Sequence, residues 1–168
     1  ITLTSPAAAG TNTITMPAST GTMALTSDVP DSVLNTYATF VNSTEKVTVA
    51  ATAATGTINY DTNTQSVVYY TSAAVGDWTI NFRASSGATL NSVIATGESI
   101  TLVHLVTLTG AEYRNTTVQV DGSSITPEWQ GGAAPTEGNI NSIDSYTYTI
   151  IKTGDAAFTI LAALTQFA

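Results

Sequence analysis

The sequence contains no cysteine among its 168 residues, which excludes a disulfide framework and a thiolate metal site. Charged residues are scarce as well, at 10% of the chain against about 25% in a typical soluble protein. The 12 acidic and 4 basic residues give a net charge of −8, and this charge repels nucleic-acid phosphates. We therefore expect no nucleic-acid partner.

Long apolar runs are also missing. No stretch approaches the roughly 18 apolar residues that cross a bilayer, and the start of the chain lacks a basic region followed by an apolar run. We therefore expect neither membrane insertion nor an export signal. Disorder is disfavoured too, because 43% of the residues are hydrophobic and valine, isoleucine, threonine and tyrosine are frequent.

Residues 1–45 are predicted to form an extended attachment or shaft segment. They alternate threonine or serine with small residues and contain too few large apolar side chains to fill a core alone. Short β segments ordered against symmetry-related copies would satisfy this pattern, and a flexible linker is the alternative. A capping candidate at Ser27 and the proline Pro30 predict a short helix near residues 30–40.

Residues 46–168 show a period-two pattern of apolar residues and are predicted to form an antiparallel β-sandwich of the jelly-roll type. The clearest turn is Asp121-Gly122, because aspartate and glycine tolerate the positive φ angles of a type I′ hairpin. A helical turn is expected between residues 89 and 94. The predicted strand pairs and single strands are 57–60 with 66–71, 78–83, 99–109, 116–120 with 123–126, and 145–152 with 157–167.

Ionisable side chains do not form a recognisable catalytic pattern. His104 lies between Val103 and Leu105 in the most apolar predicted strand, so we interpret it as a packed or subunit-interface histidine. Two carboxylates could act as acid and base in glycoside hydrolysis, but nothing in the spacing of the acidic residues selects a pair. The pairs that we considered are Asp61 with Asp77 and Glu128 with Glu137.

Cofactor and metal signatures are not found. No calcium-loop pattern closes with a glutamate, and no glycine-rich stretch lies between a strand and a helix. The sequence predicts a protein that is not an enzyme and that binds neither metal nor cofactor.

Aromatic side chains are the best candidates for ligand contact, because their faces can stack on a sugar ring. We select Trp129, Tyr113 and Tyr69 as candidate ligand-binding residues. Trp129 is the strongest of the three, since it borders a proline and two glycines in a predicted loop.

Two parts of the sequence resemble structural proteins of tailed bacteriophages. Thr11–Asp28 resembles a segment that precedes the distal domain of tail-fibre proteins. Val118–Ser124, Pro127, Trp129–Gly132 and Tyr146–Gly154 resemble the C-terminal domain of structural proteins from marine phages, including cyanophages.

The resemblance implies a place on the external surface of the virion and assembly as a homotrimer. The N-terminal segment would join other virion proteins, and the β domain would face outward. We expect a fibre or appendage subunit that binds host-surface glycans, and the alternative is a capsid decoration or cement protein. A polysaccharide depolymerase is disfavoured, because we expect no repeated β-helical coils in this chain.

Overall fold

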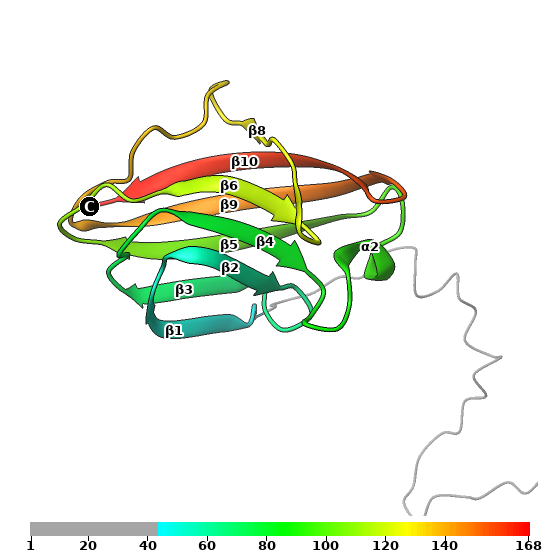
Figure 1. The fold of residues 1–168 in the computed structure, drawn as a ribbon, viewed down its shortest axis with the longest axis horizontal. Coiled ribbons are helices and arrows are strands. Elements are labelled where there is room, and N and C mark those ends of the chain that lie inside the picture. Colours follow the sequence, from blue (N-terminus) through cyan, green and yellow to red (C-terminus); the bar gives the residue numbers. More distant parts are fainter. Residues whose placement is uncertain (1–43) are drawn as a thin grey trace, which may run out of the picture. The chain divides into compact units, whose positions relative to one another are not determined.

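Two β-sheets enclose an apolar core in residues 44–168, the part of the chain that the computed structural model describes (Figure 1). The domain is all-β apart from one helical turn, as the sequence predicted. β1 begins at Val47, next to the expected domain start at residue 46. The predicted helix near residues 30–40, and all but the last two residues of the predicted segment 1–45, lie outside the described residues.

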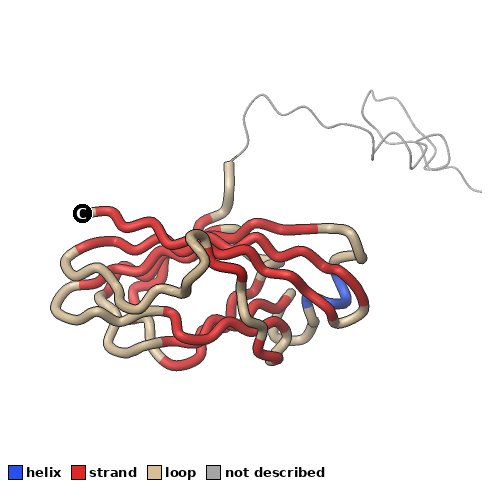
Figure 2. Tube along the Cα trace, turned by 90° about the horizontal axis from the view of Figure 1, so that it is seen from above, coloured by secondary structure: helices blue, strands red, loops and turns tan. Residues whose placement is uncertain are grey.

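We call the larger sheet, which has six strands, sheet A and the smaller one, which has four, sheet B. The two layers are seen from above in Figure 2. Sheet A has the order β1 (Val47–Ala53), β3 (Val67–Ser72), β5 (Ser99–Leu108), β9 (Ser142–Gly154), β10 (Ala157–Phe167) and β8 (Glu128–Trp129). Sheet B has the order β2 (Gly56–Asp61), β4 (Trp78–Arg83), β6 (Asn115–Val120) and β7 (Ser123–Ser124).

The first six strands alternate between the two sheets, and the pairs that they form with one another are all parallel. In sheet A, Val47 lies opposite Val67, which in turn lies opposite Val103. The chain therefore winds as a short coil that places one strand in each sheet per turn. Our expectation of antiparallel sheets is wrong for these strands, and so is our expectation that coils of the β-helical kind are absent.

The predicted hairpin between residues 57–60 and 66–71 is also wrong. β2 lies in sheet B beside β4, whereas β3 lies in sheet A between β1 and β5. The turn after Asp61 does form, with the backbone N–H of Thr64 donating to the Asp61 carbonyl at 3.1 Å. This turn carries the chain from sheet B to sheet A. Tyr60 before the turn and Val68 after it are both buried, so each sheet contributes one of them to the core between the sheets.

The C-terminal half follows the predicted antiparallel pattern except at β8, which pairs with β10 in parallel. β9 pairs with both β5 and β10, and the β9–β10 hairpin confirms the predicted pairing of residues 145–152 with 157–167. Asp121 and Gly122 have φ angles of 52° and 81°, and they connect β6 to β7 by the predicted two-residue turn. In β5, alternate residues from Leu102 to Leu108 are buried, so one face of this strand packs against the core.

Aromatic side chains join the two sheets. The rings of Trp78 and Tyr146 make an edge contact with centroids 5.6 Å apart, and those of Phe82 and Tyr148 lie 5.1 Å apart. All four side chains are buried. Such pairs add to the apolar burial that drives folding, so these contacts hold sheet B onto sheet A.

His104 lies in this aromatic core, as the sequence predicted. Its ring is fully buried and makes edge contacts with Tyr70 at 5.4 Å and Trp78 at 5.7 Å. Neither ring nitrogen has a hydrogen-bond partner among the described residues. Burial lowers the pKa of His104 to about 3, because the charged form would lose its hydration, so the ring is neutral near pH 7.

The helical turn α2 (Leu90–Val93) confirms the predicted turn and is held at both ends by charged side chains. The Asp121 carboxylate accepts hydrogen bonds from the backbone N–H groups of Leu90 at 2.7 Å and Asn91 at 3.0 Å. The Lys152 ammonium donates to the carbonyls of Asn91 at 2.5 Å and Ile94 at 2.9 Å. Both charges complement the peptide groups at their end of the helix.

Replacing Lys152 with methionine tests whether the lysine ammonium stabilises the end of α2. Lys152→Met keeps the side-chain length but leaves two carbonyl groups without their charged donor, so we expect the free energy of unfolding to fall by about 2 kcal/mol. Urea unfolding would measure the loss. The exposed Lys46 provides the control, and Lys46→Met should change stability by less than about 0.5 kcal/mol. Equal urea midpoints for the two variants would show that Lys152 does not stabilise α2.

Burial of His104 predicts a specific pH dependence of stability. Between the unfolded pKa of 6.5 and the folded pKa of about 3, the unfolded chain binds a proton that the folded chain excludes. This histidine therefore costs no stability above pH 6.5, and its penalty grows as the pH falls, by up to about 1.4 kcal/mol per pH unit.

His104→Phe removes the titrating group and keeps an aromatic ring. The free energies of unfolding of the two proteins, measured from pH 3 to pH 8, should diverge below pH 6.5 in favour of the variant. A constant difference over this range would show that His104 is not protonated on unfolding.

Candidate functional site

An open cleft of about 480 Å³ lies between the loop that follows β8 and the inward side of β10. It combines one indole, two amides, one hydroxyl and one carboxylate with a few apolar groups. The residues that line it are Trp129, Gln130, Ala133, Pro135, Thr136, Glu137, Leu164 and Gln166.

Trp129 is positioned by both the sheet and the core. β8 adds to the edge of sheet A with Trp129 opposite Ala162, and the backbone N–H of Gln130 donates to the Ala162 carbonyl at 2.7 Å. The indole ring makes edge contacts with Tyr146 and Tyr148, at centroid distances of 6.4 and 6.2 Å. Trp129 is half-buried, so its position is fixed by packing while part of it borders the cleft.

Two glycines turn the chain at one end of the cleft. Gly131 and Gly132 have φ angles of 83° and 85°, a region that other residues rarely adopt. The backbone N–H of Gly132 donates to the Trp129 carbonyl at 2.9 Å. This tight turn lets the following residues form one wall of the cleft.

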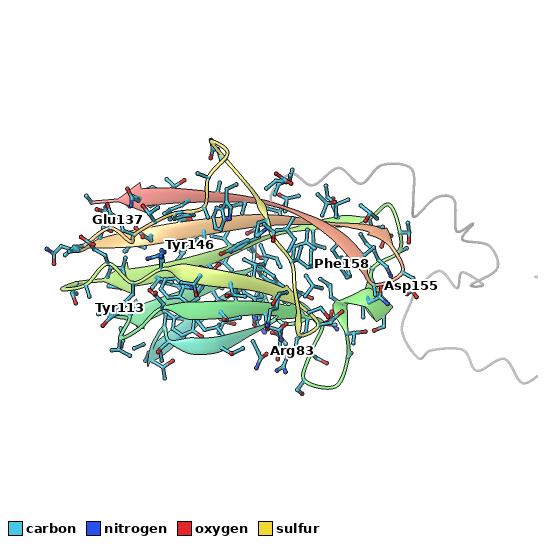
Figure 3. All side chains as sticks on the ribbon, turned by 45° about the horizontal axis from the view of Figure 1, so that its top comes forward. Arg83, Tyr113, Glu137, Tyr146, Asp155 and Phe158 are labelled. Atoms are coloured by element: carbon cyan, nitrogen blue, oxygen red, sulfur yellow. The ribbon has the colours of Figure 1, made fainter. Side chains whose placement is uncertain are left out.

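The far end of the loop is anchored at Gly138. Its backbone N–H donates to the Glu112 carbonyl at 3.0 Å, and it passes so close to Tyr113 and Leu108 that a Cβ atom would lie 2.6 Å from Leu108 Cδ1. Figure 3 shows the neighbouring Glu137 at the same end of the domain as Tyr113. Gly138 therefore fixes the position at which the end of this loop packs against the residues before β6.

Asp144 holds the next residues of the loop. Its carboxylate accepts a hydrogen bond from the Asn139 N–H at 3.1 Å, while the Ser142 hydroxyl donates to the Asn139 carbonyl at 2.6 Å. The Asp144 side chain is buried, and loss of hydration raises its pKa. We assign this carboxyl a structural role, because it does not line the cleft.

The groups in the cleft suit a neutral polar ligand. An indole offers an apolar face for stacking, and amide, hydroxyl and carboxylate groups can accept or donate hydrogen bonds to hydroxyls. Glu137 is the one carboxylate that lines the cleft. Glycoside hydrolysis ordinarily uses two carboxyl groups about 5–9.5 Å apart.

The three aromatic residues selected from the sequence do not share one site. Trp129 lines the cleft at the β8 edge, whereas Tyr69 lies on β3, with β5, β9 and β10 between them. Tyr113 is half-buried in the loop before β6 and supports Gly138 through its backbone. Neither tyrosine lines the cleft.

The two aspartates considered for hydrolysis make other contacts, and the two glutamates do not share the cleft. Asp61 forms an ion pair with Arg83 at 2.6 Å, and Asp77 accepts a hydrogen bond from the backbone N–H of Arg114 at 2.9 Å. Glu137 lines the cleft, but Glu128 does not. Gln130 is the cleft residue that the sequence could have indicated, because it follows Trp129 directly.

Residues 44–168 contain no group of three or more histidine, aspartate or glutamate side chains that could hold a metal ion. Within the same range, no helix has the length and hydrophobicity of a membrane span. No family model, curated protein or solved structure matches the chain.

A methyl group at Gly138 should disturb the loop without unfolding the sheets. Gly138→Ala forces the backbone away from Tyr113 and Leu108, and we expect a loss of about 1–3 kcal/mol with faster amide hydrogen exchange in residues 131–141. The control is Gly87→Ala, because a Cβ at Gly87 would meet nothing within 4 Å. Unchanged exchange in the loop of the Gly138 variant would show that this anchor is unnecessary.

Proposed function

We propose that this chain is a structural protein on the external surface of a tailed-phage virion, a fibre or appendage subunit whose β domain binds host-surface glycans. In this proposal the N-terminal segment joins other virion proteins, and the subunits assemble as a homotrimer. The protein binds its ligand and does not turn it over.

The cleft beside Trp129 is the observation that carries the proposal. An indole fixed by Tyr146 and Tyr148 provides a rigid stacking surface, and rigid groups lose little conformational entropy when a ligand binds. Gln130 and Gln166 supply amides around it. This combination of an aromatic face with uncharged hydrogen-bonding groups fits a sugar ring better than an ion or an apolar molecule.

The residues that resemble marine-phage structural proteins fall on important parts of the domain. Val118–Ser124 forms the turn whose Asp121 caps α2, Trp129–Gly132 forms one end of the cleft, and Tyr146–Gly154 supplies core tyrosines. The resemblance therefore concerns residues that fix both the fold and the cleft. We do not carry the jelly-roll topology into the proposal, because jelly rolls are antiparallel and β1 to β6 are not.

Two cleft variants test glycan binding. Gln166→Ala removes an amide from an exposed residue, and we expect affinity for the recognised glycan to fall about tenfold. Trp129→Ala should abolish binding. Thr165→Ala, on the opposite side of the same strand, is the control and should bind like the unchanged protein. Glycan arrays followed by calorimetry, together with adsorption of the protein to susceptible cells, are the measurements.

The outcomes separate the alternatives. Equal binding by all three variants would show that the cleft is not the glycan-binding site. If the protein binds no glycan and no susceptible host cell, it is not an adhesion protein. Protein copy number per particle tests location, since hundreds of copies would identify a capsid decoration protein and tens or fewer a tail appendage.

A further inference from the structure

The two sheets present chemically different outer faces. On sheet B, Asn59, Asn81 and Gln119 lie side by side across three strands, and the Asn81 amide donates to Asn59 at 2.9 Å. The Arg83–Asp61 ion pair lies in the next outward-facing row. These polar and charged groups bond to one another, which is typical of a face in contact with water.

The outer face of sheet A has no charged residue on its five long strands. It consists of valine, leucine, isoleucine, phenylalanine, alanine, threonine, serine and one tyrosine, and the first charged residue is Glu128 on the short edge strand β8. Two aligned rows illustrate it, namely Val47, Val67, Val103, Thr147 and Ala163, then Val49, Tyr69, Leu105, Ser145 and Thr165.

Exposed apolar side chains gather at two opposite margins of this face. Val47 and Val49 lie on β1, while Leu161 and Phe167 lie on β10, and they account for four of the seven large hydrophobic side chains that are exposed among the described residues. The strands between them carry half-buried apolar groups. Exposed apolar side chains on a sheet face without charged residues are typical of an interaction site.

Among residues 44–168, the β1 margin is also an open sheet edge. β1 pairs with β3 on one side, and it ends the strand order of sheet A. Its seven residues include no charge, proline or glycine, the features by which natural proteins usually block pairing at an edge strand. This strand can therefore pair with another strand at the margin where Val47 and Val49 are exposed.

We infer that the outer face of sheet A is the surface through which copies of this chain contact one another. The inference rests on the homotrimer of the proposed function and identifies its contact surface. A closed threefold ring needs two different patches on each subunit, one for each neighbour. The β1 margin and the β10 margin provide two such patches on one face.

Charge favours a second copy as the occupant. The chain carries 12 acidic and 4 basic residues, so identical subunits repel one another wherever these charges meet. The outer face of sheet A allows contact without bringing carboxylates together. Burial of its valine, leucine and phenylalanine side chains then stabilises the assembly.

Charged substitutions in the full-length chain test the contact surface. Val49→Glu and Leu161→Glu each place a carboxylate in one margin of the face. Val75→Glu is the matched control, because Val75 is 63% exposed against 64% for Val49 and lies in the loop between β3 and β4. Molar mass would be measured by sedimentation and light scattering over a range of concentrations.

We expect the unchanged protein and Val75→Glu to have the mass of three chains. The trimers of Val49→Glu and Leu161→Glu should be weaker. They should dissociate to single chains at protein concentrations at least about tenfold higher than the concentration at which the Val75→Glu trimer dissociates. Circular dichroism should show that each variant remains folded. The affinity of each subunit for glycan should be the same as in the unchanged protein.

Other results would overturn the inference. Trimers in all the variants would place the contact elsewhere and leave the proposed function intact. A single-chain wild type whose β1 amides are protected from exchange would show that residues 1–43 cover the face, and it would contradict the trimer too. Stable trimers of Val49→Glu that no longer join the virion would identify another virion protein as the occupant.

Discussion

Tyr146 and Tyr148 on β9 make the contact on which the two sheets and the cleft all depend. Their rings are nearly parallel, at 8°, with centroids 6.3 Å apart. Trp78 and Phe82 reach them from sheet B, and Trp129 reaches both from β8. The packing that closes the core therefore also fixes the indole of the cleft, so changes in these tyrosines would alter the stability of the domain and the position of Trp129 together.

β5 and β9 connect two differently built halves of the domain. Within sheet A, β5 ends the parallel strands through its pairing with β3 and begins the antiparallel ones through β9. The segment between β4 and β5 contains α2, whose capping by Asp121 and Lys152 ties it to the β6–β7 turn and to β9. Two charged groups thus secure the segment that carries the chain from sheet B back to sheet A.

Local features of this fold were predictable from the sequence, and the pairing of its strands was not. Period-two patterns identified most strands, and Asp121-Gly122 identified a turn because its φ angles demand those residue types. The turn after Asp61 has the same residue types whether the next strand returns beside β2 or crosses to the other sheet. That choice depends on β4 and β5, which come later in the chain and take the neighbouring places in each sheet.

The candidate site shows the same division between local and long-range information. Trp129 was predicted from its proline and glycine neighbours, but nothing near Gln166 or Glu137 in the sequence connects them to it. Their meeting requires β8 to pair with β10 and Gly138 to bind the carbonyl of Glu112. Tyr69 and Tyr113 were equally plausible from composition, and the pairing order separates them from the cleft.

The register of β10 links the two surfaces that we assign to function. Leu164 and Gln166 line the cleft, whereas Leu161 and Phe167 point to the outer face of sheet A. Because side chains alternate along a strand, a shift of one residue would exchange the two sets. The hairpin before β10 fixes the register, and Asn91 of α2 binds both Asp155 and the backbone N–H of Ala156 there. The helical turn therefore helps to determine which side chains of β10 face the cleft and which face the outer side of sheet A.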